Sequence, residues 1–285
     1  MNHLKATNLT GAVAHHAEGP VWSEAWGGLR FVDLDAGKLL TFDGVSVHTL
    51  HINQPIAAFV RPRASGGYVV ATERGIGLAE GMDLAPSRFI DLWDDASIRM
   101  NDGTVDPWGR LWAGGMAYDA RPGAASLFRI DPDLSFRPIV DGVTVSNGIG
   151  FSQNGERCFF VDTMTGRVDQ FDVLGGELAN RRPFVTFDRE QGLPDGLTIS
   201  ADGSVWIALW GGSCIHGYSP EGDLHTIVDL PVGQVSACTF GGEQLRTLFI
   251  TTSRQGLADG VDSEAGSLFA VETGYSGLPV SAFQG

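Results

Sequence analysis

Short apolar stretches alternate with glycine-containing turns along nearly the whole chain, and no long stretch has helical periodicity. One order of residues recurs six times: a polar or small residue, a short β-like stretch, a turn with glycine, and then a hydrophobic strand. The turn glycines of these copies recur every 38 to 48 residues. They are Gly28, Gly66, Gly109, Gly155, Gly203 and Gly242. This spacing matches a four-stranded antiparallel blade, which takes roughly 40–50 residues.

The repeat predicts an all-β fold: a six-bladed β-propeller with four-stranded antiparallel blades, forming a single domain over residues 1–285. In the first copy the pattern predicts strands over residues 20–22, 29–35, 38–42 and 46–52. In the fifth copy it predicts strands over residues 197–200, 204–209, 214–218 and 224–230. Residues 3–10 precede the first copy, and we expect them to pair with the last blade, because an open ring would leave sheet edges exposed. The alternative is a frayed terminus.

Composition adds constraints on partners and surroundings. A formal charge of −15 and a pI of about 4.7 argue against a nucleic-acid partner, which needs a basic surface. The three cysteines form no CxxC pair and no disulfide framework, as is typical of a reducing compartment. No stretch fits a signal peptide or a membrane span, so we expect a cytoplasmic protein without a membrane partner. We expect it to be a monomer or a weak homodimer.

The residues that open the six copies form the candidate site. In a propeller the first strand of each blade lines the central channel, so equivalent positions converge on one axis. These positions hold Glu18, Ala57, Asp102 with Asn101 beside it, Asn147, Asp195 and Ser236. Carboxylates that share a channel repel one another and lose hydration, and a cation offsets both costs. Oxygen donors without an evident His or Cys ligand favour a hard or borderline divalent ion.

A second interpretation of these residues is local. Asp-Gly and Asn-Gly are common hairpin turns, so each pair alone could mark a turn. Glu18, Asn147 and Asp195, however, each precede the turn glycine of their own copy by eight to ten residues, and this shared register favours ligands over turns. Three residues outside the register stay open as well. His15 and His16 are interpreted as surface loop residues, with the site entrance as the alternative, and Trp210 as either pocket floor or packed core.

The sequence resembles the family of gluconolactonases, regucalcin (senescence marker protein) and luciferin-regenerating enzyme. The matching segments are EGPVW at Glu18, RMNDGTVDPWGRLWAGGM at Arg99, VSNGIGFS at Val145, PDGLTISADGSVWIALWGG at Pro194 and CTFGGEQLRTLFITTSRQGL at Cys238. They span nearly the whole chain in the family's order and spacing. The resemblance implies a sugar lactonase with one divalent metal ion, which could be Ca, Zn, Mg, Mn or Fe(II).

The resemblance also implies roles for particular residues. Glu18, Asn147 and Asp195 would bind the metal, and Asp195 would be the catalytic carboxylate as well. Arg99 and Asn101 would contact the substrate. The chain departs from the family at one site position: animal members have an acidic residue there that helps to hold the sugar, and this chain has Tyr118. We therefore interpret Tyr118 as a substrate contact that favours a smaller ring, a pentonolactone over a hexonolactone.

The residues also suggest a reaction. A metal polarises the lactone carbonyl, Asp195 acts as general base on water, and Arg99 orients the substrate. The chain has no GxSxG elbow that would supply a serine nucleophile. Two alternatives come from other classes: a non-enzymatic calcium-binding propeller, and a paraoxonase-like esterase or strictosidine-synthase-like lyase. The esterase alternative would need a channel histidine as base, and no histidine lies in the register of the repeat.

Overall fold

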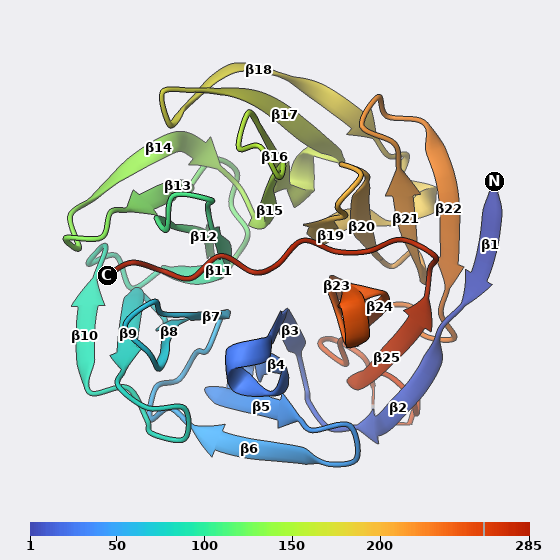
Figure 1. Cartoon of the computed structure of the whole chain (residues 1–285), viewed down its shortest axis with the longest axis horizontal. Coiled ribbons are helices and arrows are strands. Elements are labelled where there is room, and N and C mark those ends of the chain that lie inside the picture. The colour runs from blue at the N-terminus through green and yellow to red at the C-terminus, as the bar shows by residue number, and fades with distance from the viewer. Residues whose placement is uncertain (259) are drawn as a thin grey trace.

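Strands of the computed structural model, which describes residues 1–258 and 260–285, form six sheets around one central axis (Figure 1). Blade 1 contains β3 (Ala17–Ser23), β4 (Gly28–Asp33), β5 (Lys38–Phe42) and β6 (Val47–His51). Blade 2 contains β7 (Val60–Pro62), β8 (Tyr68–Ala71), β9 (Gly75–Ala79) and β10 (Arg88–Asp91). Blade 3 contains β11 (Ile98–Val105), β12 (Leu111–Ala117), β13 (Ala125–Ile130) and β14 (Phe136–Val143).

The other three blades repeat this plan. Blade 4 contains β15 (Ser146–Phe151), β16 (Arg157–Asp162), β17 (Arg167–Leu174) and β18 (Glu177–Thr186). Blade 5 contains β19 (Leu193–Ile199), β20 (Val205–Trp210), β21 (Cys214–Tyr218) and β22 (Leu224–Asp229), with β1 (Asn2–Lys5) added at its outer edge. Blade 6 contains β23 (Val235–Gly241), β24 (Thr247–Thr252), β25 (Ser267–Glu272) and, as its outer strand, β2 (Thr7–Ala12). The predicted six-bladed β-propeller is confirmed.

The N-terminal segment closes the ring, as expected, but it pairs with two blades rather than one. β2 runs antiparallel to β25 and completes the last blade. β1 runs parallel to β22 and extends blade 5 (Figure 1). Because one continuous segment contributes an edge strand to both blades, it fastens the end of the chain to its start.

The C-terminal segment, which follows β25, crosses one face of the ring and was not predicted by the repeat. It passes over the central region and ends beside blades 2 and 3 (Figure 1). Isolated bridges join Gly277 to Ser200 and Phe283 to Arg63, and the Phe283 side chain is fully buried. We call the end of the channel under this segment the tail end, and the opposite end the site end.

Helices contribute little to the fold. Within the described residues there are five 3-10 helices of three residues each: η1 (Glu24–Trp26), η2 (Leu34–Ala36), η3 (Thr163–Thr165), η4 (Arg189–Gln191) and η5 (Glu243–Leu245). None of the helices in this part of the chain has the length and apolar character needed to cross a membrane. Cys158, Cys214 and Cys238 are buried and free.

Candidate functional site

The innermost strands of five blades are irregular at the positions where the sequence predicted site residues. The pairing register shifts between Glu18 and Val21 in β3, Met100 and Asp102 in β11, Ser146 and Ile149 in β15, Pro194 and Leu197 in β19, and Val235 and Ala237 in β23. A bulge bends a strand and re-aims its side chains. The Asp-Gly and Asn-Gly pairs therefore lie inside strands, and the hairpin-turn interpretation is wrong for them.

The glycine of each pair allows neighbouring blades to approach closely at the axis. A Cβ atom on Gly148 would lie 2.6 Å from the backbone nitrogen of Leu197 in blade 5. A Cβ on Gly196 would lie 2.4 Å from the Cβ of Ala237 in blade 6. Only glycine fits at these contacts. The Asx-Gly repeat thus serves two purposes, because the first residue points a polar side chain to the channel and the second admits the next blade.

Three buried carboxyl groups share the channel: Glu18, Asp102 and Asp195. Burial and the nearby Asp102 raise the pKa of Glu18 to about 8, although the backbone N–H of Gly19 and two arginines oppose the shift. Burial, Glu18 and Asp102 raise the pKa of Asp195 well above its usual range. Burial also raises the pKa of Asp102, opposed by Arg61. The fold therefore holds acids where ionisation is costly unless a positive charge arrives.

Asn147 and Asp195 carry the polar atoms that lack partners. Among the described residues, Oδ1 of Asn147 and Oδ1 of Asp195 are both buried without a hydrogen bond. The other end of the Asn147 amide is fixed: its Nδ2 donates to Oγ1 of Thr163 (2.9 Å), and that hydroxyl donates to the carbonyl of Pro194 (2.9 Å). This chain of bonds turns the amide so that its oxygen is the free atom. Buried oxygens without donors are a suitable environment for a cation.

These residues fit an oxygen-coordinated divalent ion. Glu18 and Asp195 supply carboxylates and Asn147 an amide oxygen, which are the donor types that hard cations prefer. No group of three His, Cys, Asp or Glu side chains in the described ranges, 1–258 and 260–285, is arranged to hold a metal ion. The amide of Asn147 is therefore needed as the third protein donor. That Glu18, Asn147 and Asp195 bind a metal stays a prediction.

Arg99 and Asn101 form a rigid polar pair beside the carboxyl groups. Nη1 of Arg99 donates to Oδ1 of Asn101 (2.7 Å) and to the carbonyl of Met100 (2.9 Å). Nδ2 of Asn101 donates to the carbonyl of Ser146 in blade 4 (2.8 Å). Arg99 interacts electrostatically with Asp35 at the rim and with Glu18 and Asp195 in the channel. The two side chains thus lie between the channel mouth and the candidate metal ligands.

The rings of His16 and Trp210 pack against each other, and the surface interpretation of His16 is wrong. The His16 ring is buried, its Nδ1 lies 2.7 Å from Oγ of Ser253, and its plane meets Trp210 edge-on with ring centroids 5.7 Å apart. Burial lowers its pKa to about 4, so the ring is neutral at neutral pH. The packing of β3 against blade 6 buries it, and the sequence around His16 carries no indication of that contact. His15 is exposed, as expected.

Tyr118 lies at the rim of the same end, half exposed. Its hydroxyl donates to Oε1 of Glu73 (2.6 Å), a residue of blade 2 that the repeat did not single out. The carboxylate that position 118 lacks is therefore present next to it on another blade. No sequence pattern could have indicated Glu73, because it lies outside the register of the channel residues.

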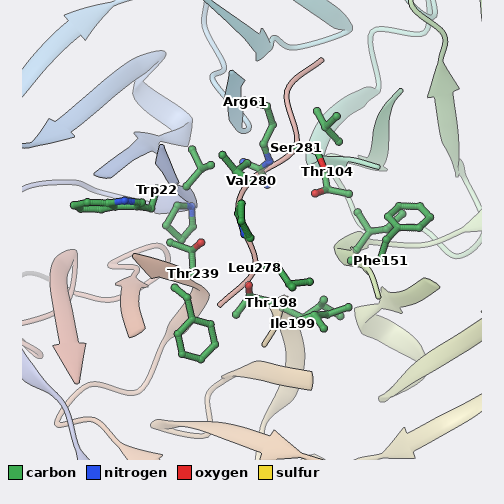
Figure 2. Close-up of a pocket in the computed structure, with 18 of the residues that line it drawn as sticks. Trp22, Arg61, Thr104, Phe151, Thr198, Ile199, Thr239, Leu278, Val280 and Ser281 are labelled. Carbon is green, nitrogen blue, oxygen red and sulfur yellow. The ribbon is translucent and has the colours of Figure 1, made fainter. Parts of the chain in front are cut away.

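A hollow occupies the tail end of the channel. It has a volume of about 360 Å³ and lies beneath residues 278–281 of the C-terminal segment. Figure 2 shows Thr104, Thr198 and Thr239, one from each of three inner strands, around this space, with Arg61 on its wall. Asp102 also lines it, whereas Glu18, Asn147 and Asp195 do not. Asp102 and Arg61 thus separate the two ends of the channel.

Comparisons with known proteins place this geometry in a family. Residues 16–254 match the family model described as the SMP-30/Gluconolactonase/LRE-like region. Bovine (Bos taurus) regucalcin is 31% identical, with 100% of both chains covered. A solved luciferin-regenerating enzyme has a TM-score of 0.89 and 26% identity, covering 98% of this chain and 99% of its own. A gluconolactonase from Xanthomonas campestris has a TM-score of 0.74 at 24% identity, covering 94% and 89%, which shows a shared fold.

Proposed function

The chain belongs to the SMP-30/gluconolactonase/LRE-like family, and from that premise we propose that it is a metal-dependent hydrolase that opens a sugar lactone to its aldonic acid. One observation carries the proposal. The buried carboxyls of Glu18 and Asp195 have raised pKa values, and Oδ1 of Asp195 and Oδ1 of Asn147 have no partner among the described residues. A site that favours a cation beside a polar mouth suits ester chemistry better than structural packing.

Glu18, Asn147 and Asp195 would hold the cation, with Thr163 fixing the amide of Asn147. When bound, a divalent cation supplies polarisation of the lactone carbonyl. Asp195 accepts a proton from the attacking water, which is general base catalysis by a group buried close to the reacting atoms. No covalent intermediate with the protein is needed, because water is the nucleophile.

Arg99 and Asn101 orient the sugar. The bonds of Arg99 Nη1 to Asn101 and Met100 fix the plane of the guanidinium, so its other N–H groups present donors in a defined direction. Sugar hydroxyls are matching acceptors. Tyr118, half exposed at the rim, offers a flat apolar face and a single hydroxyl, which favours a smaller or less hydroxylated ring, a pentonolactone over a hexonolactone.

The paraoxonase-like alternative needs a histidine as general base, and the structure contains a buried histidine near the site, His16. The pKa of His16 is too low for that role. A pKa of about 4 leaves His16 a weak base at neutral pH, and its Nδ1 is already bonded to Ser253. A general base works best when its pKa lies near the working pH. His16 is therefore better suited to contacting the substrate together with Trp210 than to activating water.

The experiment that tests the function is a panel of aldono- and uronolactones offered to cation-free protein and to protein resupplied with individual cations (Ca, Zn, Mg, Mn or Fe(II)). We expect ring opening only after a cation is returned, with matched five-carbon aldonolactones preferred over six-carbon ones. Hydrolysis that survives complete cation removal would contradict metal dependence. Calcium binding without turnover of any lactone would instead favour the non-enzymatic calcium-binding alternative.

A further inference from the structure

We propose that Glu73, held by Tyr118, is a specificity-determining residue that binds a hydroxyl group of the sugar lactone and disfavours substrates with an additional negative charge. The inference rests on the proposed lactonase function and names a further residue of its site. Glu73 lies in blade 2, outside the register of the channel residues, and its carboxylate reaches the rim of the site end.

The backbone fixes Glu73 at the rim of the site end. Glu73 lies in the turn between β8 and β9, and its carbonyl oxygen accepts a hydrogen bond from the N–H of Met100 (2.7 Å). Met100 follows Arg99 directly, so the turn of blade 2 is pinned beside the guanidinium that faces the candidate metal ligands. The backbone N–H of Tyr118 donates to the carbonyl of Ser97 (3.0 Å), which fixes the end of β12 at the same rim.

The side chains of Glu73 and Tyr118 form a directed pair. The phenol donates to Oε1 of Glu73 at 2.6 Å, a length typical of a charge-assisted bond. Partial burial and the contact with Glu73 raise the pKa of Tyr118 to about 12, so the phenol keeps its proton and remains the donor. Oε2 of Glu73 lies 3.9 Å from Nε of Arg74, beyond hydrogen-bond distance. That oxygen remains an acceptor for a ligand.

The charge at this rim determines what the pair can recognise. Glu73 and Asp35 are both acidic and about one third exposed (30% and 32%), and each has a basic neighbour on its outer side, Arg74 at 3.9 Å from Glu73 and the His15 ring at 3.6 Å from Asp35. An ionised carboxylate accepts hydrogen bonds and donates none, so its matching ligand group is a hydroxyl. A substrate carboxylate in the same place would meet like charge. The pair therefore suits a neutral polyhydroxylated lactone.

The test replaces Glu73 with the neutral isostere, Glu73→Gln, in the full-length, cation-loaded protein. Two ligands are compared: an aldonolactone as substrate, and an aldarolactone, which keeps a free carboxylate, as competitive inhibitor. We expect kcat/KM for the aldonolactone to fall about tenfold or more, since a hydrogen bond to a charged group contributes about 1.5–3 kcal/mol. The inhibition constant of the aldarolactone should stay the same or decrease, because the repulsion has been removed.

Two further variants separate recognition from structure. Tyr118→Phe removes the donor that holds Glu73 and should weaken aldonolactone use less than Glu73→Gln, and the double variant should be no worse than Glu73→Gln alone. The matched control is Glu80→Gln, an exposed carboxylate that pairs with Arg63, next to the tail-end face. Glu80→Gln should change neither kcat/KM for the aldonolactone nor the inhibition constant of the aldarolactone.

Three outcomes would overturn the proposed role of Glu73. A loss of kcat/KM with an equal weakening of aldarolactone binding would show that Glu73 only maintains the fold of the rim. No change in either ligand would show that it does not contact the substrate. Both results leave the lactonase proposal intact. A wild-type protein that opens no lactone under any cation would overturn the proposed function and this inference together.

Discussion

Two groups of buried carboxyl side chains in this propeller differ in what surrounds them. Asp33, Asp106 and Asp162 lie in the blades, and Glu18, Asp102 and Asp195 lie in the channel; all are less than one tenth exposed. Each blade carboxylate accepts at least two backbone N–H bonds. Asp33 accepts from His15 and His16, Asp162 from Thr144 and Val145, and Asp106 from Trp108 and Arg110.

Each channel carboxyl has one backbone donor rather than two. Glu18 and Asp102 accept the N–H of the following glycine, at 3.0 and 2.7 Å, and Asp195 interacts with the N–H of Gly196 and the side chain of Asn147, while its Oδ1 has no hydrogen bond within the described residues. Burial raises the pKa of all three. The blade carboxylates stabilise the fold, whereas the channel carboxyls are under-satisfied in it. Lack of a donor is not sufficient either, because Oδ1 of the buried blade residue Asp169 also has no hydrogen bond, but Asp169 is paired with Arg167 and Arg181. Burial of an acid indicates function where it lacks both donors and a cationic partner.

Two of the blade carboxylates also position the inner strands that carry channel residues. Asp33 and Asp162 end the second strands of blades 1 and 4, and each binds the backbone just before the inner strand of its own blade. That inner strand then carries Glu18 or Asn147 into the channel. The satisfied carboxylate therefore positions the segment that leads to a channel ligand.

The largest expected effect is on catalysis. Asp195→Asn keeps the shape but removes the charge, so both the candidate cation site and the general base are lost. We expect turnover of a lactone to fall about 10⁴-fold, at the upper end for a general base because the same group also holds the cation. Steady-state kinetics and cation titration by calorimetry measure the two losses. Asn101→Ala is the matched control and should reduce turnover while cation affinity is kept. Undiminished cation binding by Asp195→Asn would remove Asp195 from the ligand set.

The blade carboxylate Asp106 should show the opposite behaviour. Its side chain is fully buried, and it also accepts from Nε of Arg110 (2.6 Å) and Nε1 of Trp112 (2.9 Å). Asp106→Asn would turn an amide N–H₂ towards donors and leave Arg110 without its partner. We expect the free energy of unfolding to drop by about 3–5 kcal/mol, measured by urea titration. Asp195→Asn, in the channel, where Oδ1 has no hydrogen bond within the described residues, should cost far less stability. Equal losses in the two variants would show that channel and blade carboxylates stabilise the fold alike.

Much of this distinction could be predicted from the sequence, and the rest could not for identifiable reasons. The repeat predicted six blades and brought Glu18, Asn147 and Asp195 to one axis, because a common register on inner strands implies convergence. The third strands of blades 1 and 5, Lys38–Phe42 and Cys214–Tyr218, have the predicted bounds. The inner strands of these blades begin earlier than predicted, at Ala17 and Leu193, because bulges there interrupt the alternation of polar and apolar residues.

Features made by contacts between blades were not predictable from one copy of the repeat. Glu73 reaches Tyr118 only because blades 2 and 3 pack side by side. His16 is buried by Ser253 and Trp210, which lie more than 190 residues further along the chain. The C-terminal segment carries no repeat at all, so no alternation of residues indicated that it crosses the tail end of the channel.

A smaller effect, on cation affinity, is expected for Thr163, which contacts the candidate ligand Asn147. Thr163 accepts from Nδ2 of Asn147 and donates to the carbonyl of Pro194, so it decides which end of the amide faces the channel. Thr163→Val keeps the shape and removes both bonds. Loss of a residue that orients a metal ligand costs about ten- to a hundredfold in metal affinity, and we expect that range here. Calorimetric titration measures it, and Thr163→Ser, which keeps the hydroxyl, should restore most of the affinity. Equal affinities in the Val and Ser variants would mean that Asn147 is oriented by something else.

The smallest expected effect is a gain in stability rather than a loss. It tests directly whether Glu18 differs from the blade carboxylates. In the absence of a cation, Glu18 is a buried acid with one backbone donor, close to Asp102 and Asp195. Glu18→Gln removes an acid that burial disfavours in its ionised form and keeps an oxygen for the N–H of Gly19. We expect the cation-free protein to gain about 1 kcal/mol in unfolding free energy at neutral pH, because a carboxyl whose pKa is raised on folding destabilises the folded state above its unfolded pKa and glutamine carries no such cost. Adding a divalent cation should raise the melting temperature of the wild type but not that of Glu18→Gln, so the order of stability reverses. Thermal unfolding with and without cation measures both effects, and a variant that is less stable than the wild type in both conditions would place Glu18 with the blade carboxylates instead.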